Sequence, residues 1–171
     1  TSMDVDKGGN AWVGTVIDGF YVIDMHNFSV TRTLDIPLLS GNTVRNGIQS
    51  IYCDGENNSV WIGLYNQGMC YYHPSMNKIV LYNKKMINGD WKGEEIGCML
   101  ETSRGEILMG TTQGVYRYEP ETKSMNRFYH EFSQKNCRVL YEDSKKRVWV
   151  GTYHDGLYCI DHGKVQSYDY P

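Results

Sequence analysis

The stretch that decides the fold runs from Arg147 to Asp161 and reads RVWVGTYHDGLYCID. Two short runs of large residues, VWV and LYCI, flank a polar tip that lies between Gly151 and Gly156. Aromatic and β-branched runs joined by a short glycine-bounded connection are typical of a β-hairpin. We therefore predict a hairpin here, and the same pattern recurs along the chain.

Four copies of this pattern follow one another. The first glycine of the pair recurs at Gly14, Gly63, Gly110 and Gly151, so the copies are 49, 47 and 41 residues apart. The second glycine recurs at Gly19, Gly68, Gly114 and Gly156. In three copies a tryptophan precedes the first glycine and an acidic residue stands six or seven positions earlier: Trp12 with Asp6, Trp61 with Asp54, and Trp149 with Asp143. The third copy has Leu108 and Thr102 instead, which makes it the most divergent.

The period of the repeat predicts the fold class. Units of about 40–50 residues with several short strands are typical of propellers and β-solenoids. Apolar residues at helical spacing over a dozen positions are missing, which argues against a helical repeat. Each copy accommodates four strands separated by polar turns, and a four-stranded antiparallel sheet is the blade of a propeller. We predict an all-β chain, a β-propeller segment of four four-stranded antiparallel blades in one domain, with blades at residues 1–36, 48–82, 96–129 and 137–171.

Composition and charge exclude some functions. The net charge of −3 and the lack of a long basic run give no electrostatic footprint for nucleic acid. No apolar run reaches about 20 residues, so we expect no membrane span in this segment. The start shows no signal peptide but opens in mid-pattern, so we expect a piece of a longer protein.

The cysteines show no CxxC spacing and fall in predicted strands. We expect them to be structural thiols, with a disulfide or a metal site as alternatives. They are Cys53, Cys70, Cys98, Cys137 and Cys159.

The last copy also fits a specific pattern, D-x5-W-[VI]-G-T-x3-G-[LF]-Y, from Asp143 to Tyr158. The first copy fits it equally well from Asp6 to Tyr21. This pattern resembles the two-component-regulator propeller repeat. The second copy matches at Asp54, Trp61, Ile62, Gly63 and Gly68 but departs at Leu64, Met69 and Cys70. The third keeps Gly110, Thr111, Gly114, Val115 and Tyr116.

The resemblance implies more than the spacing does. That repeat builds the periplasmic sensor regions of hybrid two-component histidine kinases, common in gut Bacteroidetes, with two seven-bladed propellers followed by a β-sandwich, a membrane helix, a kinase and a receiver. It implies that these four blades belong to a seven-bladed ring and that the remaining blades and the kinase are partners. It further implies a ligand-sensing segment that responds to a poly- or oligosaccharide, needs no cofactor and is not itself an enzyme.

Repeated and variable positions predict different roles. We expect the tryptophans to pack between blades, the glycines to permit turns or close approach, and the aspartates to start turns. Function is expected where the copies differ, on the hairpin tips and long crossovers that share one propeller face. Three aromatic side chains there are candidates for stacking on sugar rings: Tyr65, Trp91 and Tyr153. Polar candidates for bonding hydroxyls or a uronic acid are Arg45, Asn66, Gln67, His154 and Asp155. The alternative for each is a solvated loop residue.

Two other classes of function stay open. His154 and Asp155 are neighbours, but no motif places a nucleophile, the carboxylates are not paired at a recognisable spacing, and the histidines lack metal-ligand spacing. A free-standing propeller enzyme, a polysaccharide lyase or hydrolase, is therefore an alternative with less support. The third class is a protein-interaction platform. Four blades of an open arc would expose an apolar face at each end, which predicts a homodimer through these faces.

Overall fold

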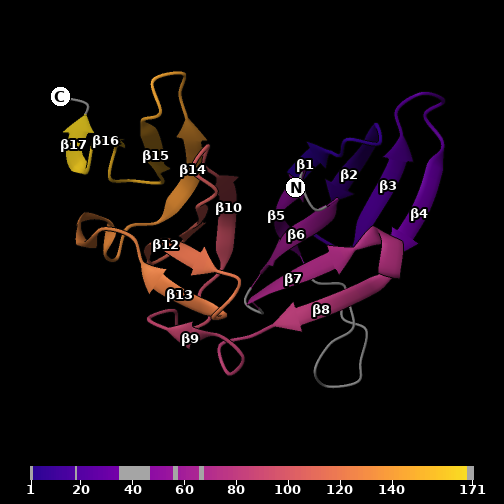
Figure 1. The fold of residues 1–171 in the computed structure, drawn as a ribbon, viewed down its shortest axis with the longest axis horizontal. Helices are drawn as coiled ribbons and strands as arrows, with labels where there is room; N and C mark the ends of the chain where they lie inside the picture. The colour runs from indigo at the N-terminus through magenta and orange to yellow at the C-terminus, as the bar shows by residue number, and fades with distance from the viewer. Residues whose placement is uncertain (1, 18, 35–46, 56–57, 66–67, 169–171) are drawn as a thin grey trace. The chain divides into compact units, whose positions relative to one another are not determined.

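The computed structural model describes residues 2–17, 19–34, 47–55, 58–65 and 68–168, and their strands form four sheets (Figure 1). The first sheet comprises β1 (Ser2–Val5), β2 (Asn10–Gly14), β3 (Phe20–Asp24) and β4 (Val30–Leu34). The second comprises β5 (Ile48–Asp54), β6 (Ser59–Leu64), β7 (Gly68–His73) and β8 (Lys78–Tyr82), with the 3₁₀ turn η1 (Pro74–Met76) before β8. The fourth comprises β14 (Cys137–Glu142), β15 (Val148–Thr152), β16 (Leu157–Asp161) and β17 (Lys164–Tyr168). Each of these sheets runs antiparallel in chain order, which confirms the predicted all-β propeller segment.

The third sheet carries one strand more than predicted. It comprises β10 (Ile96–Glu101), β11 (Ile107–Thr111), β12 (Gly114–Glu119) and β13 (Ser124–Arg127), and the two-residue β9 (Asn88–Gly89) pairs in parallel with β13. The 3₁₀ turn η2 (His130–Phe132) follows this sheet. A Cβ on Gly89 would lie 2.6 Å from the Met125 carbonyl oxygen, so only glycine lets the crossover approach β13 so closely. The sequence predicted this crossover as a loop because two residues carry no strand pattern.

The chain divides into two compact units, Thr1–Asn83 and Lys84–Pro171, each holding two sheets. In the first unit, Trp12 and Phe20 of the first sheet pack against Tyr72 of the second, with ring centroids 5.4 and 6.3 Å away. Polar contacts join the same two sheets: the Cys53 amide donates to the Asp4 carboxylate at 2.7 Å. Burial of these apolar side chains is the dominant favourable term in folding, and the polar contact fixes the register between sheets.

The second unit is built in the same way. Leu108 and Val115 of the third sheet share a buried cluster with Val150 and Tyr158 of the fourth. At the sheet ends, the Ser103 amide and hydroxyl donate to the Glu142 carboxylate at 2.8 and 3.0 Å. The packing of one sheet on the next therefore recurs with different residues.

The first motif glycine permits this packing. A Cβ on Gly14 would collide with the Ile48 side chain of the next sheet, and a Cβ on Gly110 would lie 3.3 Å from Cys137 Cβ. The second motif glycine serves the hairpin turn instead, because Gly19, Gly68 and Gly156 all have positive φ, at 75°, 91° and 82°.

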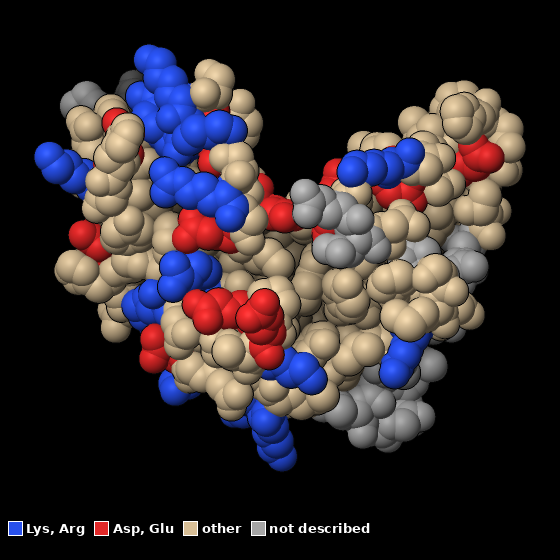
Figure 2. Space-filling view, in the orientation of Figure 1, with Lys and Arg blue, Asp and Glu red and all other residues tan. Residues whose placement is uncertain are grey.

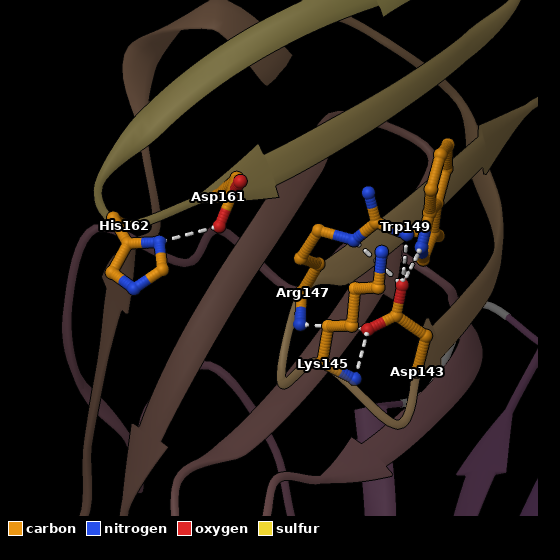
Figure 3. A network of polar contacts seen from close by, with 6 residues as sticks. All are labelled: Asp143, Lys145, Arg147, Trp149, Asp161 and His162. Atoms are coloured by element: carbon orange, nitrogen blue, oxygen red, sulfur yellow. Dashed lines mark hydrogen bonds and ion pairs between the residues drawn. The ribbon is translucent and has the colours of Figure 1, made fainter.

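The spacing between the repeated aspartate and tryptophan has a direct cause, visible in Figure 3. Asp143 caps the β14–β15 turn by accepting from the Lys145 and Arg147 amides at 2.9 and 3.1 Å. The same carboxylate accepts from Trp149 Nε1 at 2.9 Å and from Arg147 Nε at 2.7 Å. The pKa of Asp143 lies well below its usual range. The main cause is the hydrogen bond from the Trp149 indole N–H, and the hydrogen bond from the Arg147 side chain adds to it.

The first copy repeats this arrangement. Asp6 accepts from Trp12 Nε1 at 2.8 Å and from the Asn10 amide at 2.9 Å. Burial alone would raise the pKa of Asp6, but these hydrogen bonds outweigh it and lower the pKa. In the divergent third copy, Thr102 Oγ1 accepts from the Glu106 amide at 3.2 Å, while the Leu108 side chain has no N–H to donate. Thr102 therefore still caps the turn. The third copy lacks both the carboxylate acceptor and the indole donor that bond to each other in the first and fourth copies.

Candidate functional site

The hairpin tip between β15 and β16 lines an open hollow of about 740 Å³ in the second unit. The walls are Lys135, Thr152, Tyr153, His154, Asp155, Gly156 and Tyr158. The three variable tip residues proposed from the sequence, Tyr153, His154 and Asp155, therefore lie together. Lys135 comes from the crossover before β14, so the hollow lies where a hairpin tip meets a crossover, as expected for the loop face of a blade.

Short hydrogen bonds shape this tip. Thr152 Oγ1 donates to the Gly156 carbonyl at 2.8 Å and accepts from the Asp155 amide at 2.9 Å. The Tyr153 amide donates to the Asn136 carbonyl at 2.8 Å, which ties the tip to the crossover. Because the backbone is held at several points, the side chains of Tyr153 and His154 are presented outward in a defined arrangement.

An exposed aromatic pair dominates the rim. Tyr153 is 63 % exposed, and its ring centroid lies 4.2 Å from that of His154 at an interplanar angle of 66°. The Arg138 guanidinium lies 5.7 Å from the Tyr153 centroid and pairs with Glu95 at 3.3 Å. A planar ring backed by a cation and still open to solvent offers a stacking surface.

A charge pair lies beside this ring. Lys135 Nζ is 3.4 Å from Asp155 Oδ1 and 5.2 Å from the centroid of the Tyr158 ring. The Tyr158 side chain, opposed by burial and assisted by Asp155, raises the pKa of Lys135 above its usual value. Tyr158 is held in turn by the ring of Phe132, at 5.5 Å and 84°. Lys135 is therefore a fixed cation at neutral pH, with donors available to a ligand oxygen.

Neither of the other candidate residues that the structure describes, Tyr65 and Trp91, lines this hollow. Tyr65 is 51 % exposed and lies on the tip of the second sheet, in the first unit. Arg45, Asn66 and Gln67 lie outside the described residues. The stacking role expected of Trp91 does not hold, because its ring is only 3 % exposed and its Nε1 donates to the Glu94 carbonyl at 3.2 Å.

Sequence reasoning missed Lys135, Arg138 and Tyr158. Lys135 lies in the crossover before β14, and crossovers were already expected on the same face as the hairpin tips. The sequence therefore contained a signal that could have identified Lys135 as a site residue. Arg138 and Tyr158 belong to β14 and β16, the strands that flank β15, and only the pairing of these strands in the sheet brings their side chains to the tip.

A second polar cluster lies in the same unit, but it is structural. Arg127 donates to the Tyr116 hydroxyl at 3.0 Å and to the Gln113 carbonyl at 2.8 Å, and its backbone amide donates to Asp90 at 3.2 Å. Burial, with Glu94 beside it, raises the pKa of Tyr116 to about 12. This cluster fastens the crossover that contains β9 to the third sheet.

Charge elsewhere on the fourth sheet is separated from the tip. Lys and Arg side chains gather over the β14–β15 turn, which contains the exposed Lys145 and Lys146 (Figure 2). Because β15 begins after this turn and ends at the tip, the basic cluster lies at the opposite end of that strand from Tyr153. Arg147 within the cluster is neutralised by Asp143 at 2.6 Å.

The arrangement at the tip is suited to binding. It combines a stacking ring, a cation and a carboxylate. Within the described part of the chain, no group of three or more His, Cys, Asp or Glu side chains is placed to hold a metal ion. Burial raises the pKa of Cys53, Cys70, Cys98 and Cys137 to about 12, so these thiols are poor nucleophiles at neutral pH.

The fold and the tip together define a β-propeller segment with an open hollow at the β15–β16 tip. Residues 131–154 match the family model described as two component regulator propeller, which confirms the resemblance expected from the repeats. The match ends inside the tip, at His154. No curated protein is significantly similar to the chain in sequence.

Solved structures share the fold. The extracellular domain assigned to the hybrid two-component system BT3049 from B. thetaiotaomicron superposes with a TM-score of 0.77 at 18 % identity, over 97 % of this chain and 23 % of that one. The corresponding domain of BT4673 from the same organism gives 0.76 at 22 % identity, over 99 % and 22 %. A streptogramin B lyase gives 0.76 at 14 % identity, over 99 % and 54 %. The chain thus spans less than a quarter of the two extracellular domains, and these likenesses concern the fold.

Among the described residues, no helix has the length and apolar character needed to cross a membrane.

Proposed function

We propose that this chain is part of the ligand-sensing, extracytoplasmic region of a hybrid two-component histidine kinase. The family match at residues 131–154 and the fold shared with extracellular domains of such systems support the proposal. The observation that carries it is the hollow at the β15–β16 tip, where the residues that vary between the copies converge on one open surface.

The ligand class that this surface suits is an oligosaccharide. The exposed Tyr153 ring can stack on the apolar face of a sugar, while His154 and Asp155 can bond hydroxyls. Lys135 adds a cation that would favour a uronic acid, provided that the ligand carboxylate competes with Asp155 at 3.4 Å. Binding would act on the kinase by favouring one of two pre-existing arrangements of the sensor region.

Titration calorimetry against a panel of neutral and uronate oligosaccharides tests this proposal. The variants are Tyr153→Ala and Lys135→Met, and the matched control is Tyr141→Ala, which removes a tyrosine of similar exposure (60 %) from the face of the fourth sheet. We expect Tyr153→Ala to weaken binding about tenfold, equivalent to ~1.4 kcal/mol. We expect Lys135→Met to weaken binding of the uronates more than of the neutral sugars, while the control binds like the wild type.

Two results would contradict the proposal. Binding that is insensitive to Tyr153→Ala would move the site away from the tip, and no binding across the panel would reject the saccharide. Product analysis on the same mixtures separates a sensor from an enzyme, because a sensor returns the oligosaccharide unchanged and a lyase leaves shortened chains.

A further inference from the structure

Two cysteines border one small space between the third and fourth sheets. Cys98 on β10 lies directly opposite Gly110 on β11, so the two positions share a face of the third sheet. A Cβ added to Gly110 would collide with Cys98 Sγ, and it would lie 3.3 Å from Cys137 Cβ on β14 of the fourth sheet. Both cysteine side chains therefore flank the space above Gly110.

Further contacts show that the two residues are neighbours. Cys98 Sγ donates to the Cys137 carbonyl oxygen at 3.9 Å. Burial first, and the Cys137 side chain next, raise the pKa of Cys98 to about 12. Cys137 Sγ donates to the Lys135 carbonyl oxygen at 3.6 Å, which is a weak hydrogen bond. A turn about the Cα–Cβ bond of Cys137 releases its Sγ from this hydrogen bond without moving the backbone.

The equivalent positions of the first unit carry other residues. Ser2 lies opposite Gly14, at the position that Cys98 occupies in the third sheet. Ile48 begins β5 as Cys137 begins β14, and a Cβ on Gly14 would collide with the Ile48 side chain. A serine and an isoleucine therefore satisfy the same packing between sheets, so this packing does not by itself require two cysteines.

We propose that Cys98 and Cys137 form a disulfide that joins β10 to β14 when the chain folds in the presence of a disulfide donor. The two thiols give up two protons and two electrons as the bond between them forms, and the sulfur–sulfur bond of the donor breaks to leave two thiols. Disulfides form and persist outside the cytoplasm. The occurrence of this bond in the cell therefore rests on the proposed function, whereas the ability to form it does not.

The bond would fasten one wall of the hollow at the β15–β16 tip. Lys135 lines that hollow and lies two positions before Cys137, so a covalent link to β10 anchors the end of the crossover that carries Lys135. Because burial raises the pKa of both thiols to about 12, the folded, reduced chain exchanges slowly with a donor. The bond therefore forms while the third and fourth sheets come together.

Refolding from urea in a mixture of oxidised and reduced glutathione tests the proposal. Free thiols are then alkylated in urea with N-ethylmaleimide and counted by mass spectrometry. Two of the five cysteines should escape alkylation, and Cys98 and Cys137 should be recovered in one linked pair of peptides. We expect Tm to rise by about 5–15 °C relative to the chain refolded in excess reductant, because the bond restricts the unfolded state.

Two variants and a matched control locate the bond. Cys98→Ser introduces the residue that the first sheet has at this position and should leave all remaining thiols free, with no effect of glutathione on Tm. Cys137→Ala should give the same result. The control Cys159→Ala removes a buried thiol of the same unit and should keep both the linked peptides and the rise in Tm.

Several results would overturn the proposal. They are five free thiols after refolding with glutathione, a glutathione adduct in place of the linked peptides, a bond to a different cysteine, and a bond that forms without raising Tm. Circular dichroism checks that each variant folds. Because the readouts are thiol counts and Tm, a failed oligosaccharide panel leaves this test unaffected.

Discussion

Replacing Gly14 with alanine should destabilise the first unit, because the added methyl group enters an occupied space. An alanine Cβ at this position would lie 2.8 Å from Ile48 Cβ and closer still to Ile48 Cγ2. Ile48 is fully buried and packs on the opposite sheet, so it has no free volume into which it can move. The strands must separate locally or the side chain must leave its preferred rotamer.

The magnitude follows from two opposing terms. Overpacking of a well-filled core by a methyl group costs about 1–3 kcal/mol. Alanine restricts the unfolded chain more than glycine does, which returns about 0.5–1 kcal/mol. The net loss therefore lies between about 0 and 2.5 kcal/mol in the free energy of unfolding, and its midpoint of about 1.2 kcal/mol is equivalent to a fall in Tm of about 2–5 °C for a chain of this length.

Urea unfolding followed by circular dichroism measures this loss. The matched control is Gly151→Ala at the same motif position of the fourth sheet, where the nearest atom to the new Cβ is Val139 Cβ at an ordinary 3.4 Å. We expect the control to change stability by less than about 0.5 kcal/mol. A Gly14→Ala chain as stable as the wild type, or a control that loses as much, would refute the reasoning.

Three further predictions concern the turn, the core and the thiols. Because the folded-state pKa of Asp143 lies below the ordinary value of 3.8, its stabilising effect is complete above that pH and is lost as the pH falls toward the folded pKa. Asp143→Asn should therefore lower Tm at pH 7 and flatten its decline below pH 4, and an unchanged acid profile in thermal melts would contradict this. Phe132→Ala removes a fully buried ring that holds Tyr158 and should cost about 3–5 kcal/mol in urea unfolding, while a loss under about 1 kcal/mol would indicate an adaptable site. Thiols with a pKa of about 12 are present as thiolate in only about one molecule in 10⁴ at pH 8. A thiol reagent should therefore label the folded chain slowly and the urea-unfolded chain fully. Rapid labelling of the folded chain would contradict the burial of these thiols. These thiols are Cys53, Cys70, Cys98 and Cys137.

Much of the fold was accessible from the sequence because its signals are local. Hairpins such as β15–β16 are marked by Trp149, Gly151 and Gly156 within a dozen residues, and recurrence of those marks predicts the number of sheets. The strand β9 was not accessible, since the pairing of Asn88 with Ser124 joins residues far apart in sequence and depends on the docked crossover.

The candidate site was accessible only in part. Tyr153, His154 and Asp155 were identified because they vary where the copies are otherwise alike, and they do line one hollow. Trp91 was misjudged because a tryptophan in a polar crossover gives no sign of whether its ring is covered, and the structure buries it. Lys135 joins the tip only because the crossover returns beside β15.

The sequence by itself determined the hairpins, their number and the residues that close each turn, since hydrogen bonds such as Asp143 to Trp149 span only six positions. The tertiary structure decided which faces are covered and which side chains meet at the tip. Exposure depends on the neighbouring sheet, as Met3 and Ile51 show: they occupy equivalent strand positions, yet one is 67 % and the other 8 % exposed. A strand pattern specifies which side chains share a face, but only packing between sheets removes that face from water.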